Sequence, residues 1–488
     1  MTPSETSPQT PSPEDDLTPE ATAAQTQNEM PDAETSGAET PSAEPAPPEN
    51  PEQETAEAAS EEPAEAAPSS AEEAPSPASN EPPAAPPSSE EEDAPILPPS
   101  EDEEEKRRRK ILLAALLALV AALCLVAYLF VRYLNRPEPL PELLPVPVEV
   151  NYPPHYLFAI YDVDAPLGVA LSPEGDRLYV TESRGERLIK IFDTKGNLLG
   201  SFAPPRTTPA ERSPVYIATD AQGRVFVTDR LQHAVFVYDR DGNYLDTILA
   251  PTLTLSEYIA KHTGAKPQPG TFAYDIFEEE VHYQDAEGND KTLPRPDRPT
   301  WAPLGVAFTT DGRLILTDVG RKEGKENHRV LIFPAEIIAA TDWTEFNPAI
   351  QQFGSFGEAD DQFQFPNMAV LDAQGRFIVS DGNNGRLSVW DTQGNLLYLL
   401  GAGTGAGALN LPRGLFLDDR QRLYVADAVG QAIRVYDFAA EEPTFLFSFG
   451  VPGTLKGQFN YPNAVVVDAS GRLYITDREN NRVQVWSY

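Results

Sequence analysis

The C-terminal two thirds of the sequence predict an all-β fold of the β-propeller class. A strand motif close to Arg-Leu-Tyr-Val-Thr, usually followed by an acid, returns six times, at residues 176–182, 223–229, 312–318, 375–381, 420–427 and 471–477. Each copy follows a proline at a nearly constant distance, and these prolines are Pro166, Pro214, Pro303, Pro366, Pro412 and Pro462. A period of roughly 40–50 residues with several short strands per unit is typical of propellers. The longest interval lies between the second and third prolines, so the repeat tolerates insertions.

Each repeat predicts four antiparallel strands. In the fourth unit, apolar segments with strand periodicity occupy residues 368–371, 376–380, 386–390 and 396–400. Turns of the type Asp-x-x-Gly separate them, because glycine accepts the positive φ of a tight turn and Asp or Asn bonds to the local backbone. Four such strands make one blade.

The last unit resembles the NHL repeat family. Its matching segments are Pro462-Asn-Ala-Val, Leu473-Tyr-Ile-Thr-Asp477 and Asn480-Asn-Arg-Val-Gln-Val-Trp486. The resemblance extends over roughly residues 155–488 and implies a six-bladed propeller. The sixth unit ends after its third strand, so we expect residues 156–161 to pair onto it as the missing outer strand and close the ring.

The N-terminal third predicts three segments of different character. Residues 1–105 contain no Lys, Arg, Phe, Tyr or Trp, carry most of the formal net charge of −39, and predict a disordered acidic tail rich in Pro, Ala, Glu and Ser. Residues 106–132 comprise a basic flank and an apolar run. Residues 133–150 are rich in proline and predict an extended stalk. The propeller then occupies residues 151–488.

The apolar run from Ile111 to Val131 has no charged residue, and its length suits a hydrocarbon core of roughly 30 Å. Five basic residues precede it at 106–110, whereas only Arg132 and Arg136 follow it. We therefore expect an uncleaved signal-anchor and a single-pass protein of the cell membrane, with a cytoplasmic N-terminus and an extracytoplasmic propeller. The single cysteine, Cys124, lies within this run, so the propeller has no disulfide.

Two insertions predict a binding surface on one face of the propeller. Residues 251–300 link the second and third units, and the loop 319–328 joins the second and third strands of the third unit. Aromatic and charged residues in long loops favour recognition. The candidate binding residues are Tyr258, Phe272, Tyr274, Phe277, Tyr283, Trp301, Arg321, Lys322 and His328. The alternative is a lid that covers the edge of the third unit. A third insertion, 335–348, is expected on the opposite face.

No catalytic residue, metal ligand set or cofactor motif is predicted. The acids that end the second strands are Glu182, Asp229, Asp318, Asp381, Asp427 and Asp477. Arginines follow four of them at a matching place (Arg187, Arg329, Arg386 and Arg482), which favours ion pairs within each blade over a cation site. The five histidines (His155, His233, His262, His282 and His328) form no His-x-His or His-Glu-x-x-His motif.

The predicted function is recognition or scaffolding of a protein or other envelope ligand. Some six-bladed relatives of this family are metal-dependent enzymes of lyase or lactonase type, which is the alternative function. Nucleic acid binding is not expected, because the propeller is acidic and lacks a basic groove.

Overall fold

A computed structural model describes residues 101–135, 152–297, 300–340, 342–343 and 345–488. The acidic tail up to residue 100 and the stalk from residue 136 therefore lie outside the described residues. Residues 101–105 and 133–135 belong to one long helix, α1 (Glu101–Asn135). Its segment Glu105–Val131 is long and apolar enough to cross a membrane, by length and composition.

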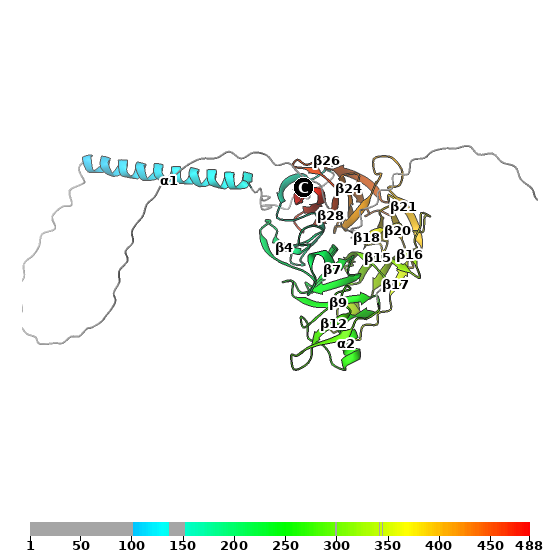
Figure 1. The fold of residues 1–488 in the computed structure, drawn as a ribbon. Coiled ribbons are helices and arrows are strands. Elements are labelled where there is room, and N and C mark those ends of the chain that lie inside the picture. Colours follow the sequence, from blue (N-terminus) through cyan, green and yellow to red (C-terminus); the bar gives the residue numbers. More distant parts are fainter. Residues whose placement is uncertain (1–100, 136–151, 298–299, 341, 344) are drawn as a thin grey trace, which may run out of the picture. The chain divides into compact units, whose positions relative to one another are not determined.

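The remaining chain is mostly β and of propeller type (Figure 1). The first sheet contains β2 (Pro166–Leu171), β3 (Arg177–Glu182), β4 (Ile189–Asp193) and β5 (Leu198–Phe202). The second contains β6 (Pro214–Thr219), β7 (Val225–Asp229), β8 (Ala234–Tyr238), β9 (Tyr244–Ala250) and β10 (Leu253–Thr254). The third contains β14 (Pro303–Phe308), β15 (Leu314–Lys322), β16 (Lys325–Phe333) and β17 (Gln351–Phe353).

The C-terminal half continues the same arrangement. The fourth sheet contains β18 (Pro366–Leu371), β19 (Phe377–Asp381), β20 (Arg386–Trp390) and β21 (Leu396–Leu400). The fifth contains β22 (Pro412–Leu417), β23 (Arg422–Asp427), β24 (Ala432–Asp437) and β25 (Thr444–Phe449). The sixth contains β28 (Pro462–Val467), β29 (Arg472–Asp477), β30 (Arg482–Ser487) and β1 (His155–Ile160). Short elements are β26 (Val451–Pro452), β27 (Gln458–Phe459) and the 3-10 turns η1 (Pro209–Glu211) and η2 (Arg478–Asn480).

Local chemistry sets the strand ends. Each repeat proline begins a first strand, where its missing N–H leaves no ladder bond unmade. The turn that follows is closed by an acid: in the fourth sheet the Asp372 carboxylate accepts the backbone N–H groups of Gln374 and Arg376, and Gly375 has φ +78°. The first strands of successive sheets contact one another in order, from β2 to β28, and β28 also contacts β2.

The pairing expected for residues 156–161 is observed over His155–Ile160, with a register shift between Tyr156 and Phe158. Strand β1 runs antiparallel to β30, with His155 opposite Ser487 and Ile160 opposite Val483. The ring of Tyr156 packs edge-on against Trp486, 6.0 Å between centroids. Strand β1, the first strand along the chain, thus becomes the fourth strand of the sixth sheet.

The large insertion packs in a different place from the one the sequence predicted. It forms β10, α2 (Leu255–Thr263) and a small sheet of β11 (Phe272–Ala273), β12 (Glu280–Gln284) and β13 (Asp290–Pro294). Strand β10 turns back onto β9, and Leu255, Ile259 and Phe272 share a hydrophobic cluster with Tyr238 and Tyr244 of the second sheet. The insertion therefore covers the outer edge of the second sheet, not the third (Figure 1).

The third insertion begins with the short helix α3 (Ala335–Ile338) and buries Trp343 and Phe346. The guanidinium of Arg224, next to the turn between β6 and β7, donates to the Ile338 and Ala340 carbonyls. The turn between β6 and β7 and the β15–β16 hairpin lie at opposite ends of their strands. The third insertion therefore lies on the face opposite the hairpin, as expected.

Candidate functional site

The first strands of the six sheets surround a cavity of about 490 Å³. Its walls come from the second halves of these strands and from the turns that follow them. The last residues of the six strands all contribute: Leu171, Thr219, Phe308, Leu371, Leu417 and Val467. The described residues that line it include several carboxylates but no His, Cys, Lys or Arg. Many of the other lining residues are apolar, such as Val169, Val306 and Leu415, so this part of the cavity is suited to apolar contacts.

Three of the carboxylates at the rim are engaged in their own turns. Asp372 forms an ion pair with Arg376 at 2.6 Å, and Asp418 pairs with Arg422 at 2.7 Å. Asp468 accepts the Ser470 hydroxyl at 2.7 Å. These acids hold the turns in place. This structural role explains why they recur in the repeats, and no ligand is needed to explain it.

The acids that end the second strands lie at the opposite strand ends from these turns. They are buried, and each has hydrogen-bonding or ionic partners. Asp318 pairs with Arg329 at 2.9 Å, Asp381 with Arg386 at 2.9 Å, and Asp477 with Arg482 at 2.7 Å. In these three sheets the two residues stand directly opposite in the strand register. The predicted structural role for these pairs is confirmed.

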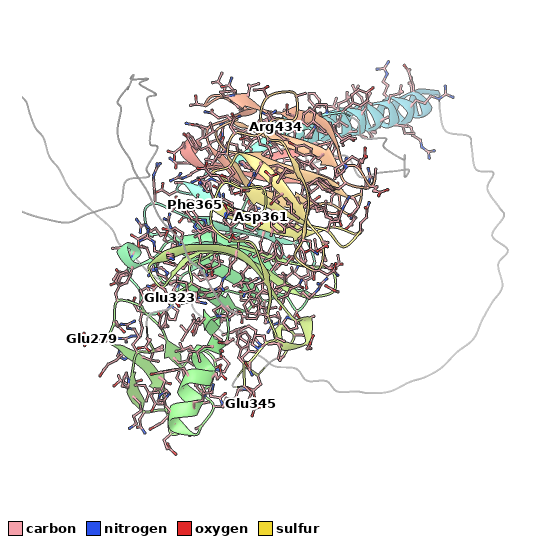
Figure 2. The ribbon with its side chains drawn as sticks, turned by 90° about the vertical axis from the view of Figure 1, so that its right-hand side faces the viewer. Glu279, Glu323, Glu345, Asp361, Phe365 and Arg434 are labelled. Carbon is pink, nitrogen blue, oxygen red and sulfur yellow. The ribbon has the colours of Figure 1, made fainter. Side chains whose placement is uncertain are left out.

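The other three sheets depart from that pattern. Arg187 does not pair with Glu182; it donates to the Arg212 carbonyl, and Lys190 lies 3.0 Å from Glu182 instead. In the fifth sheet Asp427 is paired by Arg434, which was not predicted from the sequence. Figure 2 labels Arg434. Lys190 and Arg434 stand two residues beyond the position directly opposite the acid, and therefore on the same side of the sheet. The prediction considered only basic residues closer to the acid, so it missed these two.

Asp229 in the second sheet has no ion pair among the described residues. It accepts the backbone N–H groups of Ser213, Leu231 and Gln232. Burial raises the pKa of Asp229 to about 6, and these hydrogen bonds oppose the shift only in part.

The predicted binding residues divide into two groups. Phe272, Tyr274, Trp301 and His328 are buried within the fold and present almost no side-chain surface. Tyr258 and Tyr283 are half-buried, whereas Phe277, Arg321 and Lys322 are exposed. Arg321 pairs with Glu326 of its own hairpin. Only the half-buried and exposed residues can contact a partner without a change of fold.

The structure does not bring the whole insertion to the β15–β16 hairpin. The backbone of Val319 donates to Ala302, and a side chain at Gly320 would collide with Trp301, so residues 300–302 lie against the hairpin. The helix and small sheet of the insertion instead contact the second sheet. Figure 2 marks Glu279 on the insertion and Glu323 at the hairpin tip. Of the single surface that the sequence predicted, only residues 300–302 of the insertion lie against the hairpin, and the rest of the insertion lies on the second sheet.

The histidines are held individually. The His328 ring accepts the Phe365 N–H at 3.1 Å and stands edge-on to Phe356 and Phe365, and burial lowers its pKa. His282 lies 3.2 Å from Glu278 on the insertion. No group of three His, Cys, Asp or Glu side chains that could hold a metal ion occurs in the part of the chain that the structure describes.

The sequence did not predict a group of polar residues on the first strands. Tyr216, Asn367, Arg413 and Asn463 lie on four different first strands, three of them directly after the repeat proline. The available signal was the change from apolar to polar residues at that position in the last three units.

The β-rich sheets and their central cavity define a protein of propeller type. Within this class, residues 459–486 match the family model described as the NHL repeat, which confirms the resemblance found in the last unit. No curated protein matches the chain.

Several solved structures are similar in fold. A streptogramin B lyase structure has 13% identity and a TM-score of 0.39, covering 69% of this chain and 88% of its own. Virginiamycin B lyase from Staphylococcus aureus has 11% identity and a TM-score of 0.41, with coverages of 68% and 98%. A gluconolactonase from Xanthomonas campestris has 14% identity and a TM-score of 0.41, with coverages of 69% and 94%.

Proposed function

We propose that this chain is a membrane-anchored, six-bladed NHL propeller that acts outside the cytoplasm as a recognition or scaffold module for a protein or other envelope ligand. The contacts between successive first strands, and between β28 and β2, support a ring of six blades. The basic residues 106–110 before the apolar helix segment support the cytoplasmic position of the N-terminus.

The observation that carries the recognition role is the insertion on the second sheet. Its inner side is fixed by buried residues such as Leu255 and Ile259, so it is a packed element and not a loose loop. Its outer side presents Phe277, which is 52% exposed. Arg206, Glu278 and His282 surround this segment with charge: the Arg206 guanidinium lies 3.3 Å from the Glu278 carboxylate. An exposed aromatic ring among adaptable charges is a suitable interface anchor.

A photo-crosslinking amino acid at Phe277, in the full-length chain and in its own cells, tests this role. We expect one discrete crosslinked species at this position and none at Lys456, an exposed residue on a distant loop. Phe277→Ser should remove the interaction while leaving the fold intact, because the ring is exposed. Equal crosslinking at both positions, or none at either, would count against the recognition surface.

The alternative, a metal-dependent propeller enzyme of lyase or lactonase type, requires convergent ligands near the axis. Elemental analysis of the purified full-length protein separates the two functions. Stoichiometric zinc or calcium that survives dialysis would favour the enzyme, and its absence together with crosslinking at Phe277 would favour recognition.

A further inference from the structure

The residue after each repeat proline lies close to the central axis. The side chains of Asn367 and Asn463 donate from Nδ2 to backbone carbonyls of the neighbouring first strands, at Pro412 (3.4 Å) and Leu167 (3.0 Å). Such bridges require side chains that reach from one first strand to the next. The six residues at this position are Leu167, Val215, Leu304, Asn367, Arg413 and Asn463. The position is therefore apolar in the first three sheets and polar in the last three.

Arg413 is the charged member of this set, and it has no acidic partner. Among the described residues its side chain forms one hydrogen bond, from Nη1 to the Asn367 Oδ1 at 3.0 Å, and no ion pair. The half-buried or buried arginines on the third strands behave differently, since Arg386, Arg434 and Arg482 each pair with a buried Asp. A guanidinium carries five N–H donors, so most of those of Arg413 remain available.

The surroundings of Arg413 add positive charge instead of neutralising it. Its pKa is lowered first by burial and further by Arg478 and Arg230. Arg478 lies 3.4 Å from Glu479, whereas the exposed Arg230 has no ion pair in the described part of the chain. Arg413 is half-buried, so its guanidinium is only partly hydrated. Because it stands beside further cations, an anion that joins it would be favoured.

A second donor faces the same space. The hydroxyl of Tyr216 is buried and has no hydrogen bond of acceptable geometry among the described residues, although the Asn463 amide lies beside it. Tyr216 also lines the central cavity, whereas Arg413 does not. A buried donor without an acceptor, next to a guanidinium without a counter-ion, indicates an acceptor supplied from outside the chain.

We propose that Arg413, with the Tyr216 hydroxyl, binds an oxyanion, a carboxylate or a phosphate group, near the axis of the sheets. A planar guanidinium matches both groups by paired N–H donation, and the Tyr216 hydroxyl provides a further donor. Arg230 and Arg478 supply attraction at longer range. This site is independent of the insertion surface around Phe277.

The test is direct binding to the full-length protein in detergent. Inorganic phosphate and acetate are titrated separately against chloride at constant ionic strength, with calorimetry and the thermal unfolding midpoint as readouts. We expect saturable binding of at least one anion, and the comparison of the two identifies the preferred group. If neither anion binds saturably to the wild-type protein, the proposal is wrong.

Variants locate the site. Arg413→Leu creates the triplet Pro-Leu-Gly, which already stands at this place in the first and third sheets. It should fold, should weaken anion binding about tenfold or more, and should not lower the unfolding midpoint in the absence of anion. Tyr216→Phe removes only the unpartnered hydroxyl and should weaken binding less. Lys456→Gln, the loss of an exposed positive charge elsewhere, should change nothing. Retained binding in Arg413→Leu would overturn the assignment, as would equal weakening in Lys456→Gln.

Discussion

Asp246 makes the attachment of the insertion sensitive to pH. This buried carboxylate on β9 accepts the backbone N–H groups of Thr247 at 2.7 Å and Ser256 at 3.1 Å, and also the Ser256 hydroxyl. It therefore joins strand β9 of the second sheet to the first turn of α2. Burial raises the pKa of Asp246 from its ordinary value of 3.8 to about 7, and the hydrogen bonds from Ser256 and Thr247 oppose this only in part.

The sign of the effect follows from the raised pKa. The folded protein holds the proton of Asp246 more tightly than the unfolded chain does, so the folded state loses stability as the pH rises from 3.8 through 7. The full shift corresponds to about 4 kcal/mol. Between pH 5 and pH 8 the same shift lowers the free energy of unfolding by about 2–3 kcal/mol.

Asp246→Asn isolates this contribution, since an amide has the shape of the protonated acid and does not ionise. Urea unfolding followed by tryptophan fluorescence, at pH 5 and pH 8, gives the pH-dependent loss for each protein. Asp229, whose pKa is also raised, contributes equally to both and cancels in the comparison. We expect the loss in Asp246→Asn to be smaller by about 2–3 kcal/mol than in the wild type.

The control is Asp361→Asn, which changes an exposed carboxyl and should keep the wild-type pH dependence. Hydrogen exchange of the α2 backbone adds a local readout, with faster exchange at pH 8 than at pH 5 in the wild type beyond the intrinsic effect of pH. An unchanged pH dependence in Asp246→Asn would refute the reasoning, because the loss of stability would then have to come from residues other than Asp246.

Three further predictions concern topology and packing. In a Cys124→Ala background, a membrane-impermeant maleimide applied to intact cells should label Lys456→Cys and not Ser4→Cys, and the reverse result would invert the proposed orientation. Arg482→Leu should lower the free energy of unfolding by about 3–5 kcal/mol in urea, because it leaves Asp477 buried without its partner; an effect equal to that of Lys456→Gln would contradict this. Replacing residues 253–298 by a short Gly-Ser linker should lower the thermal midpoint, because it uncovers aromatic side chains of the second sheet; an unchanged midpoint would show that the insertion is dispensable.

The sequence by itself determined the strands and most of their connections. Alternating apolar residues and Asp-x-x-Gly turns act over a few residues, so their pattern is readable without the fold. The pairing of residues 156–161 with the last unit was predictable for a related reason: an exposed strand edge must find a partner, and only one strand was left over. The pairs of Asp318, Asp381 and Asp477 followed from their place opposite an arginine in each hairpin.

Only the tertiary structure decided where the insertion lies and which polar groups meet at the axis. Strand β10 turns back onto β9, a choice made by packing against Tyr238 and Tyr244 and not by any local signal. The burial of Trp301 and His328 likewise depends on neighbours far away in the sequence. Tyr216 and Arg413 are brought near each other only because the first strands of different sheets surround one axis, and repeat spacing does not reveal which side chains then lack a partner.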